Sequence, residues 1–571
     1  MKIHDHEGFI ALSGLLQNSL TWDYVFPGLP AGCSIEWGMA KGYRRVDRDQ
    51  PFLFPPDMRE WLPAGHAVWL VIEAVRRLDT AAFHARRKTG GAGTAGYDPD
   101  MMLTLLIWAY ANGVTSSRRI ERLCQQDVAF RVICAGHLPD HVTIARFRQQ
   151  FAVTAAALFA QVLLLCAQLG MGQVGVVALD GTKVTASASK DANRTEEGLR
   201  KLAADLAARH AEADAAEDAL FGQGKRGDDD PGDPFTRAER VAAALASLQA
   251  GREAREAEER AKAEEQVRAA RAGAPAGGRP AAGARAELAA RNLARAEAAA
   301  QARREEWERA AAAGPAPGRA PARPEESGKV RAARARVERA LAAQAEREAA
   351  RQAAAAAGQQ PKRNVTDPAS RLMPVRGGGF TQGYNAQNVT SEDDLVIATK
   401  LTQDTTDTPW YEPMISEAAA AAAAMAEAGG PGDGTIGLAL ADAGYLSADN
   451  LACPGPDRLI ATGKRRALEE AARAGDAGAP AGEPAGQQAP AIAAMTARLA
   501  TQDGIAAYRR RSHIGETFHG DLKHNQQFRR LSVRGLPRAS GEWTFATAVR
   551  NLRKAITSGH LTQQALAALA S

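Results

Sequence analysis

Three acidic residues lie in sequence contexts that could place them at a metal site. Asp180 and Asp442 each follow a short apolar run, 174–179 and 436–441, and Glu516 lies among arginine and lysine residues. A short apolar run that ends in Asp is typical of a buried strand that delivers a carboxylate to the end of a sheet. Carboxylate oxygens are the ligands that Mg²⁺ prefers, and nearby basic residues would suit a phosphate backbone. The three residues therefore predict metal-dependent phosphodiester chemistry on nucleic acid.

The overall composition favours a soluble, cytoplasmic protein with several domains. At 571 residues the chain is too long for one ordinary core. Its five cysteines contain no C-x-x-C pair, which argues against a disulfide framework or a thiolate zinc site. The start lacks a signal-peptide pattern, and the longest apolar stretch, 153–169, is interrupted by Gln161 and Gln168 and is too short for a membrane span. The net charge of +5 is modest, but basic residues crowd 509–554.

The first part of the chain favours helices. Residues 1–95 have a mixed character with aromatic and proline punctuation, whereas 96–170 look wholly helical. Asp98 can cap a helix that has Pro99 at its first position, and Asp140 can cap a later one. The expected helices cover about 64–78, 101–111, 118–126 and 141–151.

Residues 191–361 differ sharply from the rest of the chain. Ala, Arg and Glu dominate there, aromatic residues almost vanish, and Gly/Pro-rich breaks interrupt the pattern. Too few large apolar side chains are present for a globular core, so we expect long solvated helices or coiled-coil arms. Disorder in parts of the segment stays open.

An α/β pattern returns after this segment. Two strand-like runs, 383–390 and 395–401, are separated by polar residues and predict a hairpin. The further expected elements are a helix at 412–427, the strand before Asp442, a strand at 458–462, and helices at 505–523 and 542–558. With 191–361 removed, the order is strand, hairpin, helix, strand, strand, helix, which matches an RNase H-like sheet.

These residues carry a family likeness. Segments 97–121 and 139–148 resemble the InsH-type helical domain of DDE transposases from bacterial insertion sequences. Further motifs resemble the catalytic domain of the same family in the right order, at 179–184, 383–387, 441–445 and 508–523. The resemblance implies four parts: a mixed region 1–95, a helical DNA-binding domain 96–170, an RNase H-like catalytic domain 171–190 with 362–558, and the insertion 191–361.

The resemblance also implies an activity. Such an enzyme cuts double-stranded DNA at the terminal inverted repeats of the element and joins the ends to target DNA, working as a homodimer or larger complex in the bacterial cytoplasm. Asp180, Asp442 and Glu516 would be the metal-binding triad. Asp180 would be shared by two Mg²⁺ ions, for which Mn²⁺ could substitute, and the other two carboxylates would each complete one ion.

The segment around Glu516 is similar to the Tyr-Arg-Glu-Lys pattern of related transposases, with Tyr508, Arg511 and Lys523 as the other members. Glu516 and Lys523 are two helical turns apart and should face the same side, so that Lys523 can hold a phosphate. Arg511 lies five residues before Glu516, which turns it roughly 140° away on a continuous helix and directs it to a different phosphate.

Other arginines are candidates for DNA contact. Arg529, Arg530 and Arg534 extend a basic path suited to the DNA backbone. Two pairs on the expected N-terminal helices could touch DNA in a helix-turn-helix manner, or could be ordinary exposed charges. These pairs are Arg118 with Arg119, and Arg146 with Arg148.

Plainer interpretations stay open at this point. Asp180 is followed by glycine and could belong to a turn, and Asp442 could cap the following helix. A metal-dependent nuclease that does not transpose would share the triad. A catalytically silent DNA-binding protein would need only the basic surfaces.

Overall fold

The computed structural model describes most of the chain. The described residues are 47–48, 57–85, 95–221, 237–272, 280–314, 318–356, 361–375, 378–463, 466–467, 469–470 and 489–569. Much of the mixed region 1–95 lies outside them. The chain divides into two compact units, and every helix and strand below belongs to the larger one, 45–86 with 97–571.

The N-terminal helices begin where the sequence supplies caps. The Asp98 carboxylate accepts a hydrogen bond from the Met101 amide at 2.9 Å, and Pro99 takes the first helical position. Asp140 likewise accepts from the amides of Val142 and Thr143. These helices confirm the predicted ones within a few residues. They are α1 (Ala67–Arg76), α2 (Ala81–His84), α3 (Pro99–Ala111), α4 (Ser117–Gln126), α5 (Val128–Ile133), α6 (His141–Arg148) and α7 (Phe151–Gln168), after the short 3₁₀ helix η1 (Met58–Trp61).

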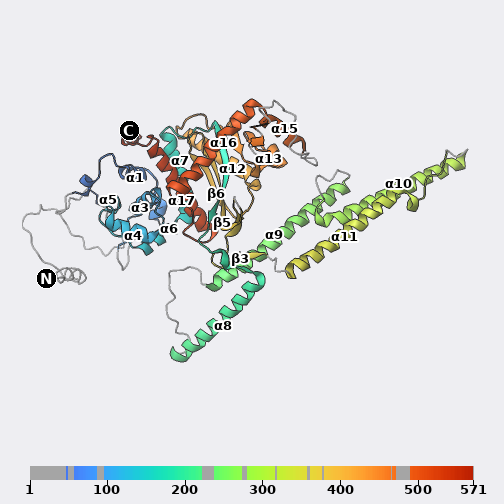
Figure 1. Cartoon of the computed structure of the whole chain (residues 1–571), viewed down its shortest axis with the longest axis horizontal. Helices are drawn as coiled ribbons and strands as arrows, with labels where there is room; N and C mark the ends of the chain where they lie inside the picture. Colours follow the sequence, from blue (N-terminus) through green and yellow to red (C-terminus); the bar gives the residue numbers. More distant parts are fainter. Residues whose placement is uncertain are drawn as a thin grey trace, which may run out of the picture. The chain divides into compact units, whose positions relative to one another are not determined.

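Helix α7 joins the N-terminal helices to the rest of the protein. It packs beside α17 (Leu536–Thr557), as Figure 1 shows. The rings of Phe151 and Phe545 stack with centroids 4.0 Å apart. The close approach of the two helices requires glycine at position 541, because an added Cβ would lie 2.4 Å from the Phe151 backbone. Among the described helices, α7 alone has the length and hydropathy of a membrane span, but 56% of that stretch is buried in the protein.

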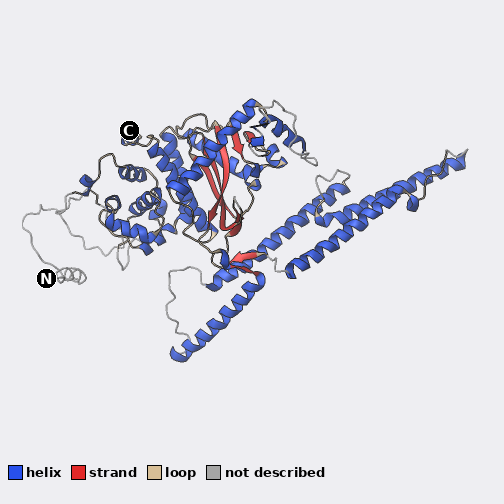
Figure 2. Ribbon diagram, viewed as in Figure 1, coloured by secondary structure: helices blue, strands red, loops and turns tan. Residues whose placement is uncertain are grey.

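A six-stranded mixed sheet forms the centre of the fold (Figure 2). Strand β1 (Val176–Thr185) pairs antiparallel with β5 (Phe380–Ser391) and parallel with β7 (Leu438–Ala441). β8 (Asp457–Ile460) runs parallel to β7. On its other edge β5 pairs with β4 (Arg371–Pro374) and β6 (Val396–Thr402). The predicted hairpin is thus confirmed as β5–β6.

The two faces of β1 pack against different helices. Val177 and Leu179 belong to the large core that also contains α7 and α17, whereas Val176 and Ala178 pack with Ile505 and other residues of α16 (Gln502–Gly520). Side chains alternate between the faces of a strand, so the alternation directs the next even-numbered residue, Asp180, toward α16.

The remaining elements of this part match or extend the prediction. Among them, α12 confirms the helix expected at 412–427, and α16 and α17 confirm the two C-terminal helices. These elements are η5 (Thr408–Trp410), α12 (Tyr411–Glu427), η6 (Ala443–Tyr445), α13 (Ala448–Ala452), α15 (Ala489–Leu499), a π-helical turn η7 (Asp521–Asn525) and α18 (Gln563–Ala568).

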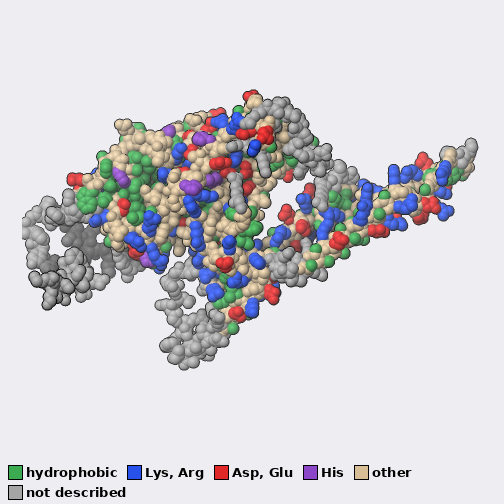
Figure 3. Space-filling model, in the orientation of Figure 1, with side chains coloured by type: hydrophobic (Ala, Val, Ile, Leu, Met, Phe, Trp, Pro, Cys, Tyr) green, Lys and Arg blue, Asp and Glu red, His purple; other side chains and the backbone are tan. Residues whose placement is uncertain are grey.

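The Ala/Arg/Glu-rich segment is helical, as predicted. It leaves β1 through η2 (Lys190–Ala192) and begins and ends with two short antiparallel strands, β2 (Asn193–Thr195) and β3 (Lys362–Asn364). Lys/Arg and Asp/Glu side chains alternate over the surface of its α10–α11 pair (Figure 3). The helices between the strands are α8 (Glu196–Phe221), α9 (Arg237–Arg271), α10 (Arg285–Ala313) and α11 (Gly328–Ala356), with the 3₁₀ turns η3 (Ala282–Ala284) and η4 (Pro324–Glu326).

Candidate active site

Asp180 and Asp442 lie side by side because β1 and β7 are parallel neighbours. The register pairs Leu179 of β1 with Ala441 of β7, and the residue that follows each of them is one of the two acids. β7 ends at Ala441, but β1 continues through Asp180 to Thr185. The prediction that Asp180 ends its strand was therefore wrong, and so was the alternative that Asp180 and Gly181 form a turn. The long antiparallel pairing with β5 extends β1.

Asp442 also has a structural role. Its carboxylate caps η6 by accepting a hydrogen bond from the amide of Gly444 at 2.9 Å. The capping alternative is thus confirmed for Asp442. Capping uses one oxygen of the carboxylate, so it does not exclude a second role for the same side chain.

Glu516 reaches the same region from α16. This helix crosses β1 at Gly515, where an added Cβ would lie 3.5 Å from the Cβ of Asp180. The neighbouring Glu516 side chain is 54% exposed, in contrast to the Asp180 side chain, which is 11% exposed. The third acid is therefore the solvent-facing member of the group.

Arg511 connects two of the three acids. Its Nη1 lies 3.6 Å from Oδ1 of Asp180, and its Nη2 lies 3.3 Å from Oε1 of Glu516. The prediction that Arg511 turns away from Glu516 was wrong. The backbone positions do diverge on the helix, but the long arginine side chain brings the guanidinium group back between the two carboxylates.

The electrostatics of Arg511 follow from this position. Burial alone would lower the pKa of its guanidinium group, but Tyr508, Asp180, Asp442 and Glu516 outweigh burial and raise that pKa. Tyr508 is itself buried, and the Arg511 guanidinium lies 6.0 Å from its ring centre. The burial of Tyr508 speaks against the direct DNA contact expected for it.

A fourth carboxylate, Asp407, was missed by the sequence analysis. It accepts hydrogen bonds from Asn385 Nδ2 at 2.6 Å and Gln387 Nε2 at 2.7 Å, and Lys183 Nζ lies 3.4 Å away. An added Cβ on Gly181 would lie 2.8 Å from Asp407 Oδ1. The sequence signal for it was a pair of amide residues, Asn385 and Gln387, two positions apart on β5. Both side chains are buried, and buried amides need a polar partner.

Tyr445 reports how close these acids are. Burial raises the pKa of its hydroxyl well above the ordinary value, and Asp407, Asp180 and Asp442 raise it further. The hydroxyl donates a hydrogen bond to Oε1 of Gln387. Three carboxylates thus act electrostatically on one buried phenol.

Basic and polar groups border the acids. Lys523, on the π-helical turn η7, donates a hydrogen bond from Nζ to Oγ1 of Thr182, which lies two residues beyond Asp180 on the same face of β1. His519 Nε2 lies 3.5 Å from Oδ2 of Asp180. Lys523 therefore lies beside the strand that carries Asp180, and the helix changes from α to π before it.

The other candidate DNA contacts divide by exposure. Arg529, Arg530 and Arg534 are exposed, as are Arg118, Arg119 and Arg146. Arg148 is buried, with Nη1 donating to Ser532 Oγ at 2.8 Å and Nη2 donating to the Thr115 carbonyl at 2.7 Å. Its burial speaks against a DNA contact, since the guanidinium group ties α6 to the segment before α17.

The donor chemistry suits a hard divalent cation, but the acids are not gathered into a ligand set. Among the residues that the structure describes, no three His, Cys, Asp or Glu side chains lie close enough together to hold a metal ion. Carboxylates of Asp180, Asp442 and Glu516 supply the oxygen donors that Mg²⁺ prefers. Arg511 separates Glu516 from Asp180, so metal binding at all three requires this side chain to move.

Two family models match the chain. A transposase domain (DUF772) matches residues 56–150, which contain η1 through α6. A transposase DDE domain matches residues 485–556, which contain α15, α16 with Glu516, and nearly all of α17. The two matches support the assignment of the chain to the DDE transposases of insertion-sequence type. No curated protein and no solved structure matches the chain.

Proposed function

We propose that this transposase binds divalent metal through Asp180, Asp442 and Glu516, and uses it to cut element ends and join them to target DNA. The observation that carries the proposal is the parallel register of β1 and β7. It places Asp180 beside Asp442, while α16 crosses β1 next to Asp180 and brings in Glu516. A nuclease that acts on phosphodiesters needs such acids on rigid elements.

The sheet supports an RNase H-like catalytic domain. The strand order β6-β5-β1-β7-β8 combines an antiparallel β6–β5–β1 portion with the parallel strands β7 and β8, and α16 packs on β1. The helical segment from η2 to β3 interrupts this domain between β1 and β4. We accordingly propose the domain limits 171–190 with 362–558, the insertion 191–361 and the N-terminal helical domain 96–170.

Bound Mg²⁺ or Mn²⁺ would stabilise the charges on the entering and leaving oxygens of the phosphodiester. Asp180 adjoins Asp442 through the β1–β7 register and adjoins the helix that carries Glu516, so it suits the shared ligand. Asp442 can keep its bond to Gly444 while its remaining oxygen capacity binds the ion. Mg²⁺ retains bound waters, so a partly exposed residue such as Glu516 is a suitable ligand.

The protein's own cations would position the DNA. Arg511 balances the charges of Asp180 and Glu516, and once that guanidinium group is released it can bind a backbone phosphate. Lys523 is held beside the site by Thr182 and can hold a second phosphate. The exposed arginines of α4 and α6, with Arg529, Arg530 and Arg534, would provide sequence-independent affinity for double-stranded DNA.

A strand-transfer assay tests the proposed function. The wild-type protein is mixed with Mg²⁺, a target plasmid and a pre-nicked duplex made from the inverted repeats that flank its own open reading frame. We expect joined products that need Mg²⁺ or Mn²⁺ and disappear with EDTA. Cutting without joining would indicate a non-transposing nuclease, and binding with neither reaction would indicate a catalytically silent DNA-binding protein. We also propose that the protein works as a dimer or larger assembly in the bacterial cytoplasm. Sedimentation of the purified DNA complex would measure the number of protein chains in it.

A further inference from the structure

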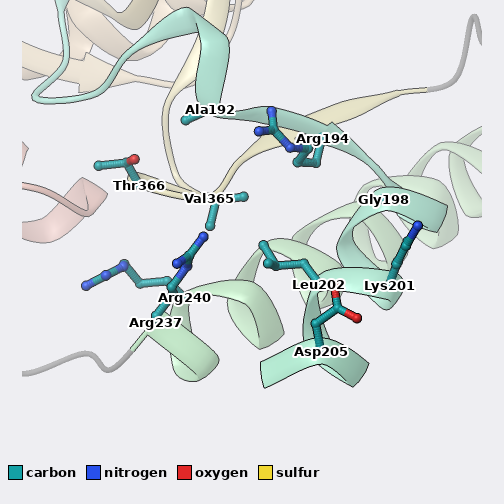
Figure 4. Close-up of a pocket in the computed structure, with 10 residues that line it drawn as sticks. All are labelled: Ala192, Arg194, Gly198, Lys201, Leu202, Asp205, Arg237, Arg240, Val365 and Thr366. Atoms are coloured by element: carbon teal, nitrogen blue, oxygen red, sulfur yellow. The ribbon is translucent and has the colours of Figure 1, made fainter. Parts of the chain in front are cut away.

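A cavity of about 380 Å³ lies at the base of the insertion, lined by α8, α9 and the β2–β3 ladder (Figure 4). Four basic residues line it: Arg194, Lys201, Arg237 and Arg240. Asp205 is the acidic residue of the lining. In Figure 4, Arg194 lies on one side of Val365, and Arg240 reaches toward Val365 from the opposite side. The cavity therefore carries a net positive charge and suits an anion.

Two arginines face each other across the β2–β3 ladder beside this cavity. Arg194 stands directly opposite Arg363 in the β2–β3 register, and like charges placed opposite each other destabilise a strand pair. Arg194 Nη1 donates to the carbonyls of Asp191 at 2.6 Å and Asn193 at 3.0 Å, not to a carboxylate. Within the described residues, no ion pair holds Arg194 or Arg363.

Arg363 also lies beside a further arginine, Arg371. Arg363 Nε and Arg371 Nη2 both donate to Oγ of Ser247 on α9, at 3.1 Å and 3.2 Å. Burial, and then repulsion from Arg363, lower the pKa of Arg371 to about 10. A bound polyanion would reduce the repulsion among these arginines at the base of the insertion and would thereby stabilise the fold there.

The ladder that forms one wall of the cavity is fixed to the central sheet and to the segment that follows β1. Asn193 Nδ2 donates to Gln382 Oε1 of β5 at 2.8 Å, and Asn364 Nδ2 donates to the carbonyl of Ser189 at 2.7 Å. Two exposed arginines donate hydrogen bonds to the segment between β1 and the β2–β3 ladder. Arg530 Nε donates to the Ala186 carbonyl and Arg534 Nε to the Ser187 carbonyl, each at 3.2 Å.

The chain length limits how far the cavity can be from the acids. Arg194 lies fourteen positions after Asp180, so the two Cα atoms are at most about 50 Å apart. That limit corresponds to roughly 15 base pairs of duplex at a rise of about 3.4 Å. A duplex longer than this with its end at Asp180 is therefore long enough to span the separation.

We propose that this cavity binds a backbone phosphate of the DNA whose end lies at the acidic site. The insertion then acts as a DNA-contacting part of the enzyme, with Arg530 and Arg534 lying along the path between the two sites. This inference rests on the proposed function, because that function supplies the DNA. Recognition is through phosphate charge and does not depend on base sequence.

The test measures DNA affinity without cleavage. The full chain is titrated into a fluorescent duplex of about 40 base pairs in EDTA, over a series of salt concentrations. The double variant Arg237→Ala with Arg240→Ala should bind about tenfold more weakly. Its plot of log affinity against log salt should lose about one unit of slope, because the contact to one backbone phosphate is removed. Arg237→Lys, which keeps the charge, should stay near wild type.

The matched control is Arg331→Ala, which removes an exposed arginine of α11 that does not line the cavity. It should leave affinity and slope unchanged. Unchanged affinity and slope in the double variant would overturn the inference. A change in calorimetric binding of inorganic phosphate with no change for DNA would also overturn it, since the cavity would then serve free phosphate. If the wild type binds DNA with the predicted arginine dependence but joins no ends, the proposed function fails and the DNA contact stands.

Discussion

Asp180→Asn, Asp442→Asn and Glu516→Gln are each expected to reduce metal-dependent DNA cleavage by at least about a hundredfold, since each would remove a charged ligand from the proposed metal site, where catalysis would be electrostatic. Each substitution keeps the size of the side chain. Asn can still cap η6 in place of Asp442, because its amide oxygen accepts from the Gly444 amide. Glu516 is exposed, so its replacement leaves the packing intact. The expected loss is therefore one of catalysis and not of folding.

The measurement is the rate of Mg²⁺-dependent cleavage of terminal-repeat DNA, with DNA affinity determined in parallel by anisotropy in EDTA. Affinity should change little for all three variants. Asp449→Asn is the matched control, because Asp449 is an exposed acid on α13 shortly after Asp442. It should cleave at the wild-type rate. Normal cleavage by any one of the three variants would remove that residue from the proposed ligand set.

Arg550→Ala is expected to cost about 3 kcal/mol of folding free energy, because it removes the one fully buried partner of Asp394 and Asp521 and leaves these carboxylates only the more exposed Lys554 and Arg553. The Arg550 side chain is 1% exposed. Its Nη2 lies 2.5 Å from Oδ2 of Asp394 and its Nε lies 3.3 Å from Oδ2 of Asp521. Asp521 begins the π-helical turn that carries Lys523, so the same contact also supports the position of a proposed phosphate-binding residue.

Arg553→Ala provides the comparison on the same helix. Arg553 also pairs with Asp521, at 2.7 Å, but its side chain is 30% exposed, and it should contribute less than about 1 kcal/mol. Guanidinium denaturation of both variants, followed by circular dichroism, gives the two changes in midpoint. Equal losses would contradict the view that burial makes Arg550 the more important partner.

The main parts of the fold were predictable because local patterns and tertiary packing agree. The apolar run before Asp442 forms β7, and Asp98 and Asp140 cap the helices expected of them. Two buried strands that each lead to an aspartate had only to be parallel neighbours to bring the acids together, and β1 and β7 are. The extension of β1 past Asp180 was not predictable, since it depends on pairing with β5, which lies far along the chain.

Side-chain placement in the site was harder to predict than the strands. Helical geometry turns the backbone of Arg511 away from Glu516, yet the long side chain returns to it. Asp407 follows no apolar run and is placed by amides on β5. Arg148 was expected to face solvent, but its side chain is buried like that of the preceding Phe147 on α6. Each case depends on partners that are distant in the sequence or on side-chain flexibility.

The insertion shows the same limit. Composition predicts its long helices, because Ala, Arg and Glu favour the helical conformation. The segment also has too few large apolar side chains to form a globular core. Strands β2 and β3 have three residues each and are too short for any sequence pattern to indicate. The basic cavity beside them arises only when α8 and α9 fold against this ladder.

Iron-mediated cleavage of the protein backbone tests the central claim most directly. Fe²⁺ is bound in place of Mg²⁺, and ascorbate with peroxide then generates hydroxyl radicals that cut only nearby peptide bonds. If Asp180, Asp442 and Glu516 bind one metal centre, the cuts will fall in three segments around these residues, and excess Mg²⁺ will suppress all three together. Cuts near only one of them, or cuts that Mg²⁺ does not suppress, would contradict a shared metal site.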